Sequence, residues 1–309
     1  MKALIAGLGS IGTKHVKAIQ ACDPQARICA LRSRPDSRPC PGVTDIHSIE
    51  EAAAFAPDYA VVCTPTVAHA DTVAALLPLG VPLMIEKPLF MNPGEEARCP
   101  GLDSVLTYVA CNLRHLSSIA WLRDYIAAHP EMRVNEVNAY CGSYLPEWHP
   151  GSDWRAHYSA SEAMGGGVPL DLIHEIDYVT YIFGLPQQSL GIARSRSSLA
   201  IDAPDFAAYH LLYPGFTANV TLDYYRRDYR RTLETVFDSD TWTLDLAANT
   251  IRNSKGTTVF ADTQRIADTY TAQARYFINL VRTGATTSMN TAAHAQKILK
   301  IATDYERLG

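Results

Sequence analysis

Three residues that could exchange protons recur at a fixed interval in the second half of the chain. Asp171, His174 and Asp177 are three residues apart, so on a helix they share one face. A histidine between carboxylates has a fixed tautomer and titrates near neutral pH, as acid–base catalysis requires. The alternative is that Asp171 caps a helix and His174 forms an ordinary hydrogen bond in the core. The glycine run 165–167 precedes this segment and predicts a close approach of backbone to a ligand.

A lysine follows a short apolar segment in the first half of the chain. Residues 81–85 are typical of a buried strand, and Glu86-Lys87-Pro88 ends it. Open α/β sheets bind ligands at the carboxyl edge of their strands, so the ammonium of Lys87 is expected at such an edge. A half-buried lysine there can orient a substrate hydroxyl or exchange its proton. A simple Glu86–Lys87 ion pair explains the same residues equally well.

The chain begins with a glycine pattern that suits a dinucleotide. An apolar run over residues 3–6 leads into a G-x-G-x-x-G pattern, and a segment that can be helical follows. Gly7 allows the tight turn, Gly9 lets a pyrophosphate approach the backbone, and Gly12 lets helix and strand pack closely. An ordinary glycine turn is the alternative, but the position between strand and helix favours dinucleotide binding through the helix N-terminus. The expected cofactor contacts in this segment are Gly7, Gly9, Ser10, Ile11 and Gly12.

The type of dinucleotide is predicted from the end of the second strand. Residues 26–31 form that strand, and Arg32, Ser33 and Arg34 follow it, about 20 residues beyond the glycines, where an acid would hold the ribose of NAD. No acid stands there. Two guanidinium groups and a hydroxyl could instead bind a 2′-phosphate through charge-assisted hydrogen bonds. A solvated basic loop is the alternative; the position favours NADP(H), with NAD(H) as the other option.

Three motifs, in this order, resemble those of the Gfo/Idh/MocA oxidoreductases, a family named for glucose–fructose oxidoreductase and inositol dehydrogenase. They are the G-x-G-x-x-G-x-x-H of residues 7–15, the T-P-T-x-x-H of residues 64–69 and the E-K-P of residues 86–88. The resemblance implies that Lys87 lies beside the nicotinamide and the reacting carbon. It also places the second motif in a loop on the cofactor side. The residues that it adds to the cofactor site are Thr64, Pro65, Thr66, His69, Glu86 and Lys87.

The same resemblance implies roles in the second half of the chain. The family places an aspartate and a histidine after a glycine run, and the histidine, matched here by His174, is its usual acid–base residue. Many members space this pair D-x-x-x-H, whereas this chain has D-x-x-H, so the role of Asp171 departs from the pattern. Asp177 keeps the family's spacing to the histidine. The expected catalytic residues are Lys87, His174, Asp177 and Asp171.

An aromatic segment that also contains histidine and arginine precedes the glycine run. Residues 144–160 offer ring faces and hydrogen-bonding groups that suit a hydroxylated ring, and Arg155 suits a carboxylate or phosphate. A well-packed surface loop is the alternative. Together with residues 165–178, the segment resembles a narrower subgroup of the family from gene clusters for surface polysaccharides, flagellar glycans and sialic-acid-like nonulosonic acids. The expected substrate contacts are Arg114, Tyr144, Trp148, His149, Arg155 and Tyr158.

Two domains are expected to position these residues. Strands that alternate with helices over residues 1–114 predict a Rossmann dinucleotide-binding domain. From residue 115 to 309, strand-like segments separated by few helices predict an α+β domain with an open, mainly antiparallel sheet, which binds substrate and forms oligomers. The expected elements of this α/β protein's second domain are a helix at 116–128, strands at 134–144, 190–195, 205–213, 217–225, 232–237 and 241–245, and helices at 269–283 and 292–307.

The composition is that of a folded protein and argues against several classes. Of the 309 residues, 47% are hydrophobic and 19% are charged, and a net charge of −5 gives no indication of a nucleic-acid partner. The longest apolar stretch, 73–85, is broken by prolines and too short to span a bilayer, and a signal-peptide core is missing. We therefore expect a cytoplasmic protein with no membrane partner. Seven scattered cysteines fit free thiols better than disulfides or a metal site.

Together, the residues and the resemblance predict an enzyme that transfers a hydride between NADP(H) and a sugar, nucleotide sugar or sugar acid in surface-glycan biosynthesis. An inositol or polyol dehydrogenase on the same scaffold is one alternative. A non-catalytic protein that senses dinucleotides is the other. The resemblance also implies a homo-oligomer, a dimer or tetramer, formed through the exposed face of the C-terminal sheet.

Overall fold

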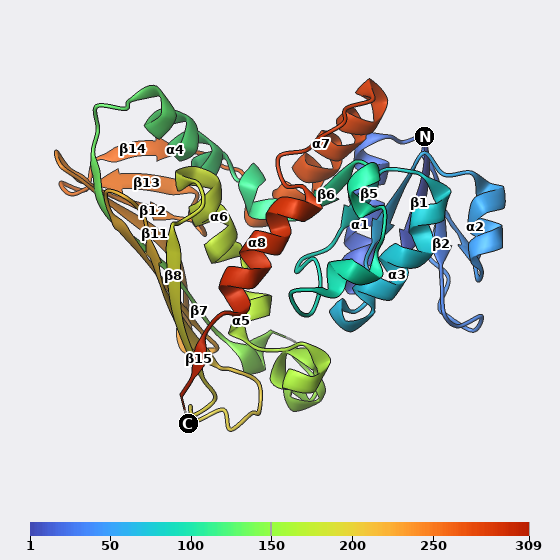
Figure 1. The fold of residues 1–309 in the computed structure, drawn as a ribbon, viewed down its shortest axis with the longest axis horizontal. Coiled ribbons are helices and arrows are strands. Elements are labelled where there is room, and N and C mark those ends of the chain that lie inside the picture. Colours follow the sequence, from blue (N-terminus) through green and yellow to red (C-terminus); the bar gives the residue numbers. More distant parts are fainter. Residues whose placement is uncertain (149, 309) are drawn as a thin grey trace. The chain divides into compact units, whose positions relative to one another are not determined.

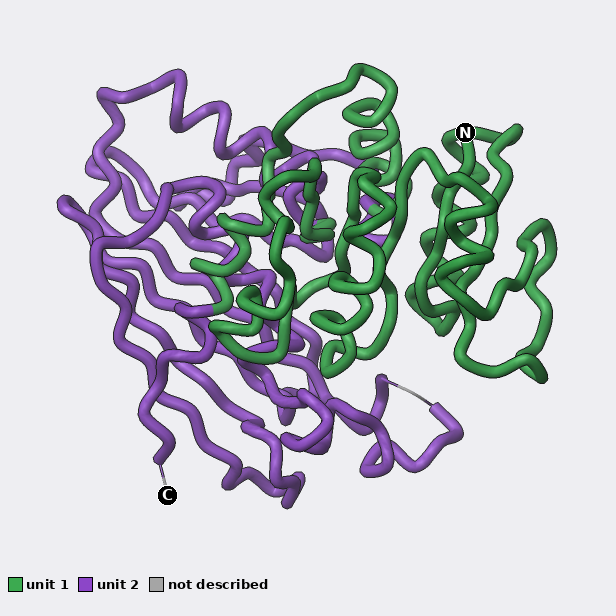
Figure 2. The backbone as a smooth tube through the Cα atoms, turned by 45° about the vertical axis from the view of Figure 1, so that its right-hand side comes forward, with its two compact units in different colours: residues 1–112, 270–299 green, residues 113–269, 300–309 purple. Residues whose placement is uncertain are grey.

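The chain divides into two compact units in the computed structural model, which describes residues 1–148 and 150–308 (Figure 2). The first unit comprises residues 1–112 and 270–299. The second comprises residues 113–269 and 300–309. The chain therefore leaves the first unit after its sixth strand and returns to it near the C-terminus.

A six-stranded parallel sheet forms the centre of the first unit, with the strand order β3-β2-β1-β4-β5-β6 (Figure 1). The order reverses between β1 and β4, and dinucleotides bind at such a switch point in doubly wound folds. Residues 3–6 of β1 are at most 1% exposed, as expected for a parallel strand that is covered on both faces. The elements are β1 (Lys2–Ala6), α1 (Ser10–Cys22), β2 (Arg27–Leu31), β3 (Val43–Ile46), α2 (Ile49–Phe55), β4 (Tyr59–Val62), α3 (His69–Leu76), β5 (Leu83–Ile85) and β6 (Thr107–Val109).

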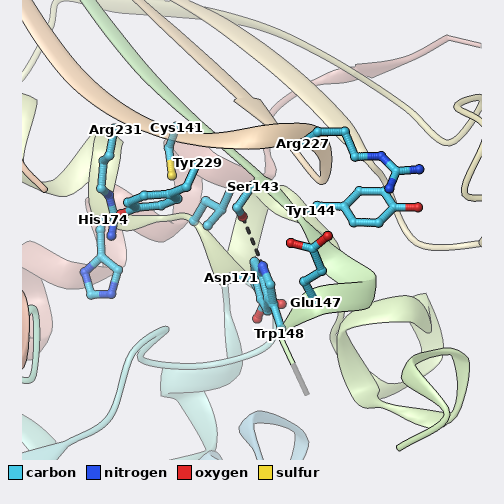
Figure 3. Close-up of a pocket in the computed structure, with 11 residues that line it drawn as sticks. Cys141, Ser143, Tyr144, Glu147, Trp148, Asp171, His174, Arg227, Tyr229 and Arg231 are labelled. Carbon is cyan, nitrogen blue, oxygen red and sulfur yellow. Dashed lines mark hydrogen bonds between the residues drawn. The ribbon is translucent and has the colours of Figure 1, made fainter. Parts of the chain in front are cut away.

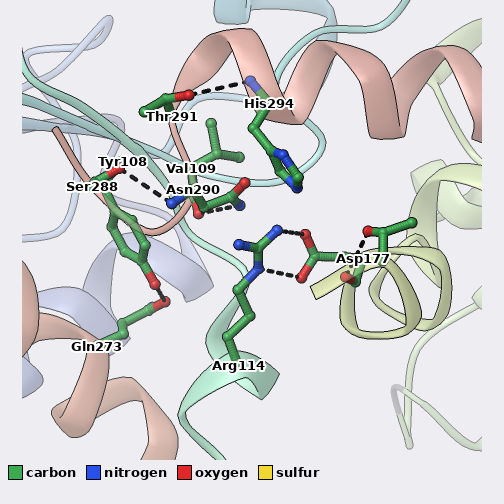
Figure 4. Close-up of polar contacts among 10 residues, drawn as sticks. Tyr108, Val109, Arg114, Asp177, Gln273, Ser288, Asn290, Thr291 and His294 are labelled. Carbon is green, nitrogen blue, oxygen red and sulfur yellow. Dashed lines mark hydrogen bonds and ion pairs between the residues drawn. The ribbon is translucent and has the colours of Figure 1, made fainter. Parts of the chain in front are cut away.

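A segment near the C-terminus covers the edge strand β6. The backbone N–H of Val109 donates to the Asn290 carbonyl at 2.8 Å, and the Asn290 side-chain amide donates to the Val109 carbonyl at 2.9 Å (Figure 4). The Ser288 hydroxyl donates to the Thr107 carbonyl at 2.6 Å. These contacts satisfy backbone groups that an open edge would leave available to another chain.

The helix α7 (Thr269–Thr283) also packs with the first unit. Its residues Phe277 and Ile278 belong to the same buried cluster as Ile5 of β1 and Tyr108 of β6. Most of α8 (Ala292–Thr303) falls in the first unit as well. Sequence reasoning placed all residues after 115 in the second domain, because the local pattern of a helix does not show which sheet it covers.

The second unit is built on a nine-stranded sheet with the order β14-β13-β12-β11-β7-β10-β9-β8-β15. Six of its eight strand pairs are antiparallel, and β7–β10 and β8–β15 are parallel. The helices α4 and α6 lie on one side of this sheet (Figure 1), which confirms the expected α+β domain after a Rossmann domain. The elements are α4 (Ser117–Ala128), β7 (Val134–Tyr144), α5 (Val168–Asp171), α6 (His174–Phe183), β8 (Gln188–Arg194), β9 (Phe206–Leu212), β10 (Thr217–Asp223), β11 (Tyr225–Phe237), β12 (Thr241–Asp245), β13 (Thr250–Asn253), β14 (Thr258–Ala261) and β15 (Glu306–Arg307).

A row of polar side chains crosses four strands of the large sheet. The Asn138 amide donates to Glu234 at 3.2 Å, and the Asn219 amide donates to Asn138 at 2.8 Å. The row continues with His210, whose Nδ1 lies 2.7 Å from the Asn219 side-chain oxygen. Residues that alternate with these, such as Val220, are fully buried. One face of the sheet is therefore apolar and covered, and the other is a hydrogen-bonded polar surface.

Several elements differ from the predictions. The expected break between strands at 217–225 and 232–237 is wrong, because β11 runs through the arginine-rich residues 225–231 as a bulged strand. The helix expected at 292–307 ends at Thr303. Sequence reasoning missed α2, although a signal for it exists: Ser48 and Glu51 form a capping box in which each side chain accepts the other's backbone N–H. It also missed the short strands β3, β13, β14 and β15.

Candidate active site

The glycine turn after β1 has the geometry that a pyrophosphate requires. Gly7 has a φ of +88°, and a Cβ atom there would lie 2.8 Å from backbone atoms of Cys63 and Thr64. A Cβ atom on Gly12 would lie 2.4 Å from the Gly7 carbonyl oxygen, whereas a Cβ atom on Gly9 would meet nothing within 4 Å. The space beside Gly9 is thus open, and no side chain caps α1, which begins at Ser10. The first N–H groups of α1 can therefore receive a dinucleotide pyrophosphate.

The basic residues after β2 are not equally available. Arg32 donates to the Asp45 carboxylate of β3 and to the Arg38 carbonyl, both at 3.3 Å, and its side chain is 11% exposed. Ser33 and Arg34 are exposed. A phosphate at this position would meet Arg34 directly, whereas Arg32 already has an acidic partner.

Lys87 follows β5 on a turn that a buried carboxylate braces. The Lys87 backbone N–H donates to Oε2 of Glu86 at 3.2 Å, and Nε2 of His15 in α1 lies 2.6 Å from Oε1 of the same carboxylate. His15 is 1% exposed and Glu86 is 7% exposed. One carboxylate therefore links the helix that follows the glycine turn to the backbone of the lysine. Glu86 therefore holds both this turn and His15, in addition to standing beside Lys87 in the sequence.

His69 links the loop after β4 to the same turn. It is 1% exposed; its Nδ1 lies 3.0 and 3.1 Å from the carbonyl oxygens of Pro88 and Leu89, and its Nε2 lies 3.0 Å from the Thr64 carbonyl. Burial lowers the pKa of His69, and the carbonyl acceptors, which favour the charged form, offset part of that effect. Of the neighbouring residues, Pro65 is exposed and Thr66 is half-buried. His69 thus holds the motif-bearing loop and the Lys87 turn together.

The glycine run of the second unit serves the fold rather than an open approach to a ligand. A Cβ atom on Gly166 would lie 2.1 Å from the Tyr158 carbonyl oxygen, and Gly167, with a φ of +107°, would meet Pro204 at 2.8 Å. These positions let two backbone segments of the protein pass close to each other. The predicted approach of this backbone to a ligand is corrected accordingly.

The three acid–base candidates lie on two short helices and not on one. α5 ends at Asp171, Leu172 leaves the helical conformation, and α6 begins at His174. Asp171 and His174 both line a cavity of about 410 Å³ in the second unit (Figure 3). Asp177 does not line it. The expectation of one shared helical face is therefore wrong, because the helix breaks between the first two members.

Two predicted substrate contacts line the same cavity. Tyr144 is half-buried, and the Trp148 indole N–H donates to the Ser143 hydroxyl at 3.1 Å. The Trp148 ring packs edge-to-face on Tyr224, at 5.3 Å between centroids, and the Tyr224 hydroxyl donates to Asp171 at 2.6 Å. Burial, and then the Asp171 carboxylate, raise the pKa of Tyr224 well above its usual value, so this hydroxyl stays protonated and remains a donor.

Asp177 and Arg114 form a buried ion pair with each other. Nε and Nη2 of Arg114 donate to the two carboxylate oxygens of Asp177 at 2.9 and 2.7 Å, and both side chains are at most 2% exposed (Figure 4). The Arg114 guanidinium also lies 4.8 Å from the centre of the Tyr181 ring. Both carboxylate oxygens of Asp177 are thus engaged by a guanidinium.

A second buried ion pair fixes the neighbouring position of α6. Arg231 of β11 donates to both oxygens of Glu175 at 2.5 and 3.0 Å, and Glu175 is fully buried. Burial opposes the charge of Arg231, but Glu175 more than compensates and raises its pKa well above the usual value. The helix that begins at His174 is therefore held from two sides, by Arg231 and by Arg114.

Other cavity residues were missing from the predicted site. Tyr229 and Arg231 lie two positions apart on β11, a strand alternation that could have indicated a shared face. Cys141 also lines the cavity, but burial raises the pKa of its thiol to about 12, which keeps it protonated. The remaining unpredicted lining residues are Ser143, Glu147, Leu172 and Arg227.

The other predicted substrate contacts fall elsewhere. Arg155 is exposed and lies 4.2 Å from the ring centre of Trp154, and Tyr158 is 48% exposed. Neither lines the cavity. His149 lies outside the described residues.

Within residues 1–148 and 150–308, no group of three or more histidine, cysteine or acidic side chains is placed to hold a metal ion. All seven cysteines are free thiols. No helix in the described part of the chain has the length and apolar character needed to cross a membrane.

Comparisons with known proteins agree with this geometry. The chain is 24% identical to inositol 2-dehydrogenase of Leifsonia xyli over 304 residues, which cover 91% of this chain and 85% of the relative. A levoglucosan dehydrogenase in complex with NADH superposes with a TM-score of 0.82 at 15% identity, over 98% of this chain and 95% of that one. A UDP-N-acetylglucosamine 3-dehydrogenase from Acidithiobacillus ferrooxidans superposes with a TM-score of 0.78 at 17% identity, over 99% and 96%. At these identities, the two solved structures show a shared fold.

A family model identifies the first unit more directly. Residues 1–99 match the model of the oxidoreductase family with an NAD-binding Rossmann fold, the Gfo/Idh/MocA family. This range contains the open glycine turn, the loop held by His69 and the turn that carries Lys87. Residues 1–99 therefore form an NAD-binding Rossmann domain of the Gfo/Idh/MocA oxidoreductase type.

Proposed function

We propose that the protein is a dehydrogenase or reductase that transfers a hydride between a nicotinamide cofactor and a carbinol or ketone carbon of a sugar, nucleotide sugar or sugar acid. The observation that carries this proposal is the cavity of the second unit. Its lining combines aromatic rings, two acids, a histidine and arginines, which suits a hydroxylated ring. The names of the inositol, levoglucosan and UDP-N-acetylglucosamine dehydrogenases support the same substrate class. The likeness of residues 144–178 to the surface-glycan subgroup supports a place in surface-glycan biosynthesis.

The bound nicotinamide supplies the hydride acceptor or donor. In this proposal, His174 exchanges the proton of the reacting hydroxyl as general acid or base. Lys87 donates a hydrogen bond to the same oxygen, and its positive charge favours the alkoxide that develops there. Asp171, which accepts from Tyr224 and lines the same cavity, helps to orient His174. Asp177 acts as a positioning residue through Arg114, since its carboxylate is committed to that guanidinium.

Substitution of the two proposed catalytic residues tests this function. We expect Lys87→Ala and His174→Ala each to lower kcat by about 10²- to 10⁴-fold while circular dichroism and the unfolding midpoint stay unchanged. His210→Ala is the matched control, because His210 lies in the polar row of the large sheet and not in the cavity. Wild-type kcat in both catalytic variants would overturn the proposal.

The cofactor proposal is a preference for NADP(H), carried mainly by Arg34 with support from Ser33 and Arg32. The exposure of Arg34 and the missing acid after β2 support this preference. Arg32 contributes less to phosphate binding, because its guanidinium already donates to Asp45. Fluorescence titration of NADPH and NADH tests it. We expect tighter binding of NADPH, lost in Arg34→Ala; equal or tighter binding of NADH to the wild type would refute the preference and favour NAD(H).

The relative named inositol 2-dehydrogenase favours a second candidate, oxidation of inositol or another polyol. Hydride exchange measured with myo-inositol beside a set of sugars separates the two candidates. A protein that binds the cofactor but exchanges hydride with no member of the set would instead be a dinucleotide sensor.

We also propose a homo-oligomer, a dimer or tetramer, formed through the large sheet of the second unit. Leu190 and Ile192 on β8 are 52% and 37% exposed and form an apolar edge beside the polar row. Analytical ultracentrifugation should show a defined oligomer that dissociates in an Ile192→Glu variant. A monomer at micromolar concentration would refute this proposal.

A further inference from the structure

The strand β11 bulges where it borders the cavity. Tyr225 pairs with Tyr144 of β7, and the next paired residue, Arg230, faces Gly142. Five steps along β11 thus match two steps along β7, so the bulge contains three additional residues. Bulges re-aim side chains and are frequent beside functional sites.

Hydrogen bonds give the bulge a defined shape. The backbone N–H groups of Tyr225 and Arg226 donate to one oxygen of Asp223 at 3.2 and 2.9 Å, and the Arg226 guanidinium donates to Asp228 at 2.6 Å. Opposite the bulge, a Cβ atom on Gly142 would lie 2.9 Å from the side chain of Arg226, so the two strands are in close contact there. The side chains that the bulge presents are therefore held by the fold.

The four arginines of this segment have different partners. Arg226 pairs with Asp228, and Arg231 pairs with Glu175. Arg230 lies 5.7 Å from the ring centre of Tyr140. The guanidinium of Arg227 lies only 3.7 Å from the ring centre of Tyr144, within the lining of the cavity (Figure 3). Among the residues that the structure describes, no ion pair joins Arg227 to a carboxylate.

A stacked guanidinium of this kind is prepared to bind an anion. The Tyr144 ring lies against the guanidinium, and no ion pair among the described residues engages the N–H donors of Arg227, which can therefore form charge-assisted hydrogen bonds with an anion. Stacking also restricts the long side chain before any ligand binds, which reduces the entropy lost on binding. Glu147 lines the same cavity, but no ion pair joins it to Arg227 among the described residues. The positive charge of Arg227 is therefore still available to attract an anion.

We infer that Arg227, held on Tyr144 by the bulge of β11, binds an anionic group of the substrate, a carboxylate or a phosphate remote from the reacting carbon. The inference rests on the proposed function and narrows its substrate class to acidic or phosphorylated sugars. Arg227 is then a specificity residue, and His174 in the same cavity serves the reacting hydroxyl.

Calorimetric titration of the protein saturated with NADPH tests this inference with paired probes. The neutral probes are glucose, galactose and mannose, and the anionic probes are their uronates, their 1-phosphates and UDP-glucose. We expect at least one anionic probe to bind about 10- to 100-fold tighter than its neutral counterpart, the usual range for a charge-assisted contact. Preference for a uronate identifies a carboxylate, and preference for a 1-phosphate or UDP-glucose identifies a phosphate.

Two variants of the bulge complete the test. Arg227→Gln should remove the preference while the neutral probes bind within about threefold of wild type, and Arg227→Lys should restore part of it, since lysine keeps the charge but not the paired geometry. Arg230→Gln, in the same segment but outside the cavity, should leave the preference intact. No anionic preference in the wild type, or equal losses in Arg227→Gln and Arg230→Gln, would overturn the inference.

The same proteins separate this inference from the function on which it rests. Reduction of NAD(P)⁺ by neutral sugars, with no anionic preference, would leave the proposed function standing and remove the role of Arg227. If no probe, neutral or anionic, exchanges hydride with the cofactor, the proposed function itself is wrong.

Discussion

The two residues proposed to act on the reacting oxygen are held in different ways. Lys87 stands on a turn fixed by uncharged backbone groups, a histidine and one carboxylate, all within the first unit. His174 begins a helix, α6, whose first turn is fixed by two ion pairs, Glu175–Arg231 and Asp177–Arg114. In the second unit, removal of one member of an ion pair leaves the other charged side chain without its partner. In the first unit, removal of His69 mainly leaves backbone carbonyl groups without a hydrogen-bond donor. Substitutions around His174 should therefore affect stability most, and those around Lys87 should affect cofactor binding more.

The largest effect should come from breaking an ion pair of α6. We expect Glu175→Ala to destabilise the protein by about 3–5 kcal/mol, because Arg231 would remain buried without its partner. Urea denaturation measures this loss. A Glu175→Leu, Arg231→Met double variant should recover most of it, since apolar residues of similar volume remove both charges together. A loss below about 1 kcal/mol in Glu175→Ala would show that the pair does not hold α6.

A pH effect should follow in the same unit. Burial, and then the positive charge of Arg114, lower the pKa of His115 from 6.5 to about 4. Below pH 6.5 the unfolded chain binds a proton that the folded chain refuses, so stability should be complete above pH 6.5 and fall as the pH decreases toward 4. The loss should not exceed about 3 kcal/mol. Urea midpoints between pH 7 and 4 measure it; a His115→Gln variant with the same slope as wild type would contradict this assignment.

In the first unit, His69→Phe should have a moderate effect on stability. Removal of the ring nitrogens leaves the Thr64, Pro88 and Leu89 carbonyls without this donor, at a cost of about 1–3 kcal/mol. Because the same ring holds the loop at Thr64 and the turn of Lys87, NADH affinity should also fall. The stability and NADH affinity of His69→Gln, which keeps one hydrogen-bond donor, should lie between those of wild type and those of His69→Phe. Unchanged NADH affinity in His69→Phe would show that the contact serves folding alone.

The smallest effect is expected from Tyr224→Phe. The variant loses one hydrogen bond to Asp171, at 2.6 Å, and keeps the packing against Trp148. We expect a loss of about 1 kcal/mol in unfolding free energy and a larger proportional change in kcat than in NADH affinity. If only NADH affinity changes, Asp171 does not belong to the surroundings of His174.

The parts of this site that the sequence predicted are those with a local physical cause. Gly7 and Gly12 were predictable because the tight turn and the close packing of helix on strand each demand a residue without a Cβ atom. The ion-pair partners of α6 were not predictable from the sequence. Arg114 and Asp177 are 63 residues apart and Arg231 and Glu175 are 56 residues apart, so only the folded chain brings them together.

The same reason explains the misread strand β11. Its residues 225–231 include four arginines and one aspartate and show no alternation of apolar and polar residues, so only pairing with β7 makes them a bulged strand. The packing of α7 on the Rossmann sheet was equally inaccessible, since an amphipathic helix does not encode which of two sheets it covers.

The central proposal is that Lys87 and His174 act in the same catalytic step. It is tested most directly by kcat of wild type, Lys87→Ala, His174→Ala and the double variant, measured on one substrate. If the two residues act as a unit, the double variant should be scarcely slower than the slower single variant, because the second loss removes little that remains. If the two single losses multiply, or if neither variant is slower than wild type, the account is contradicted.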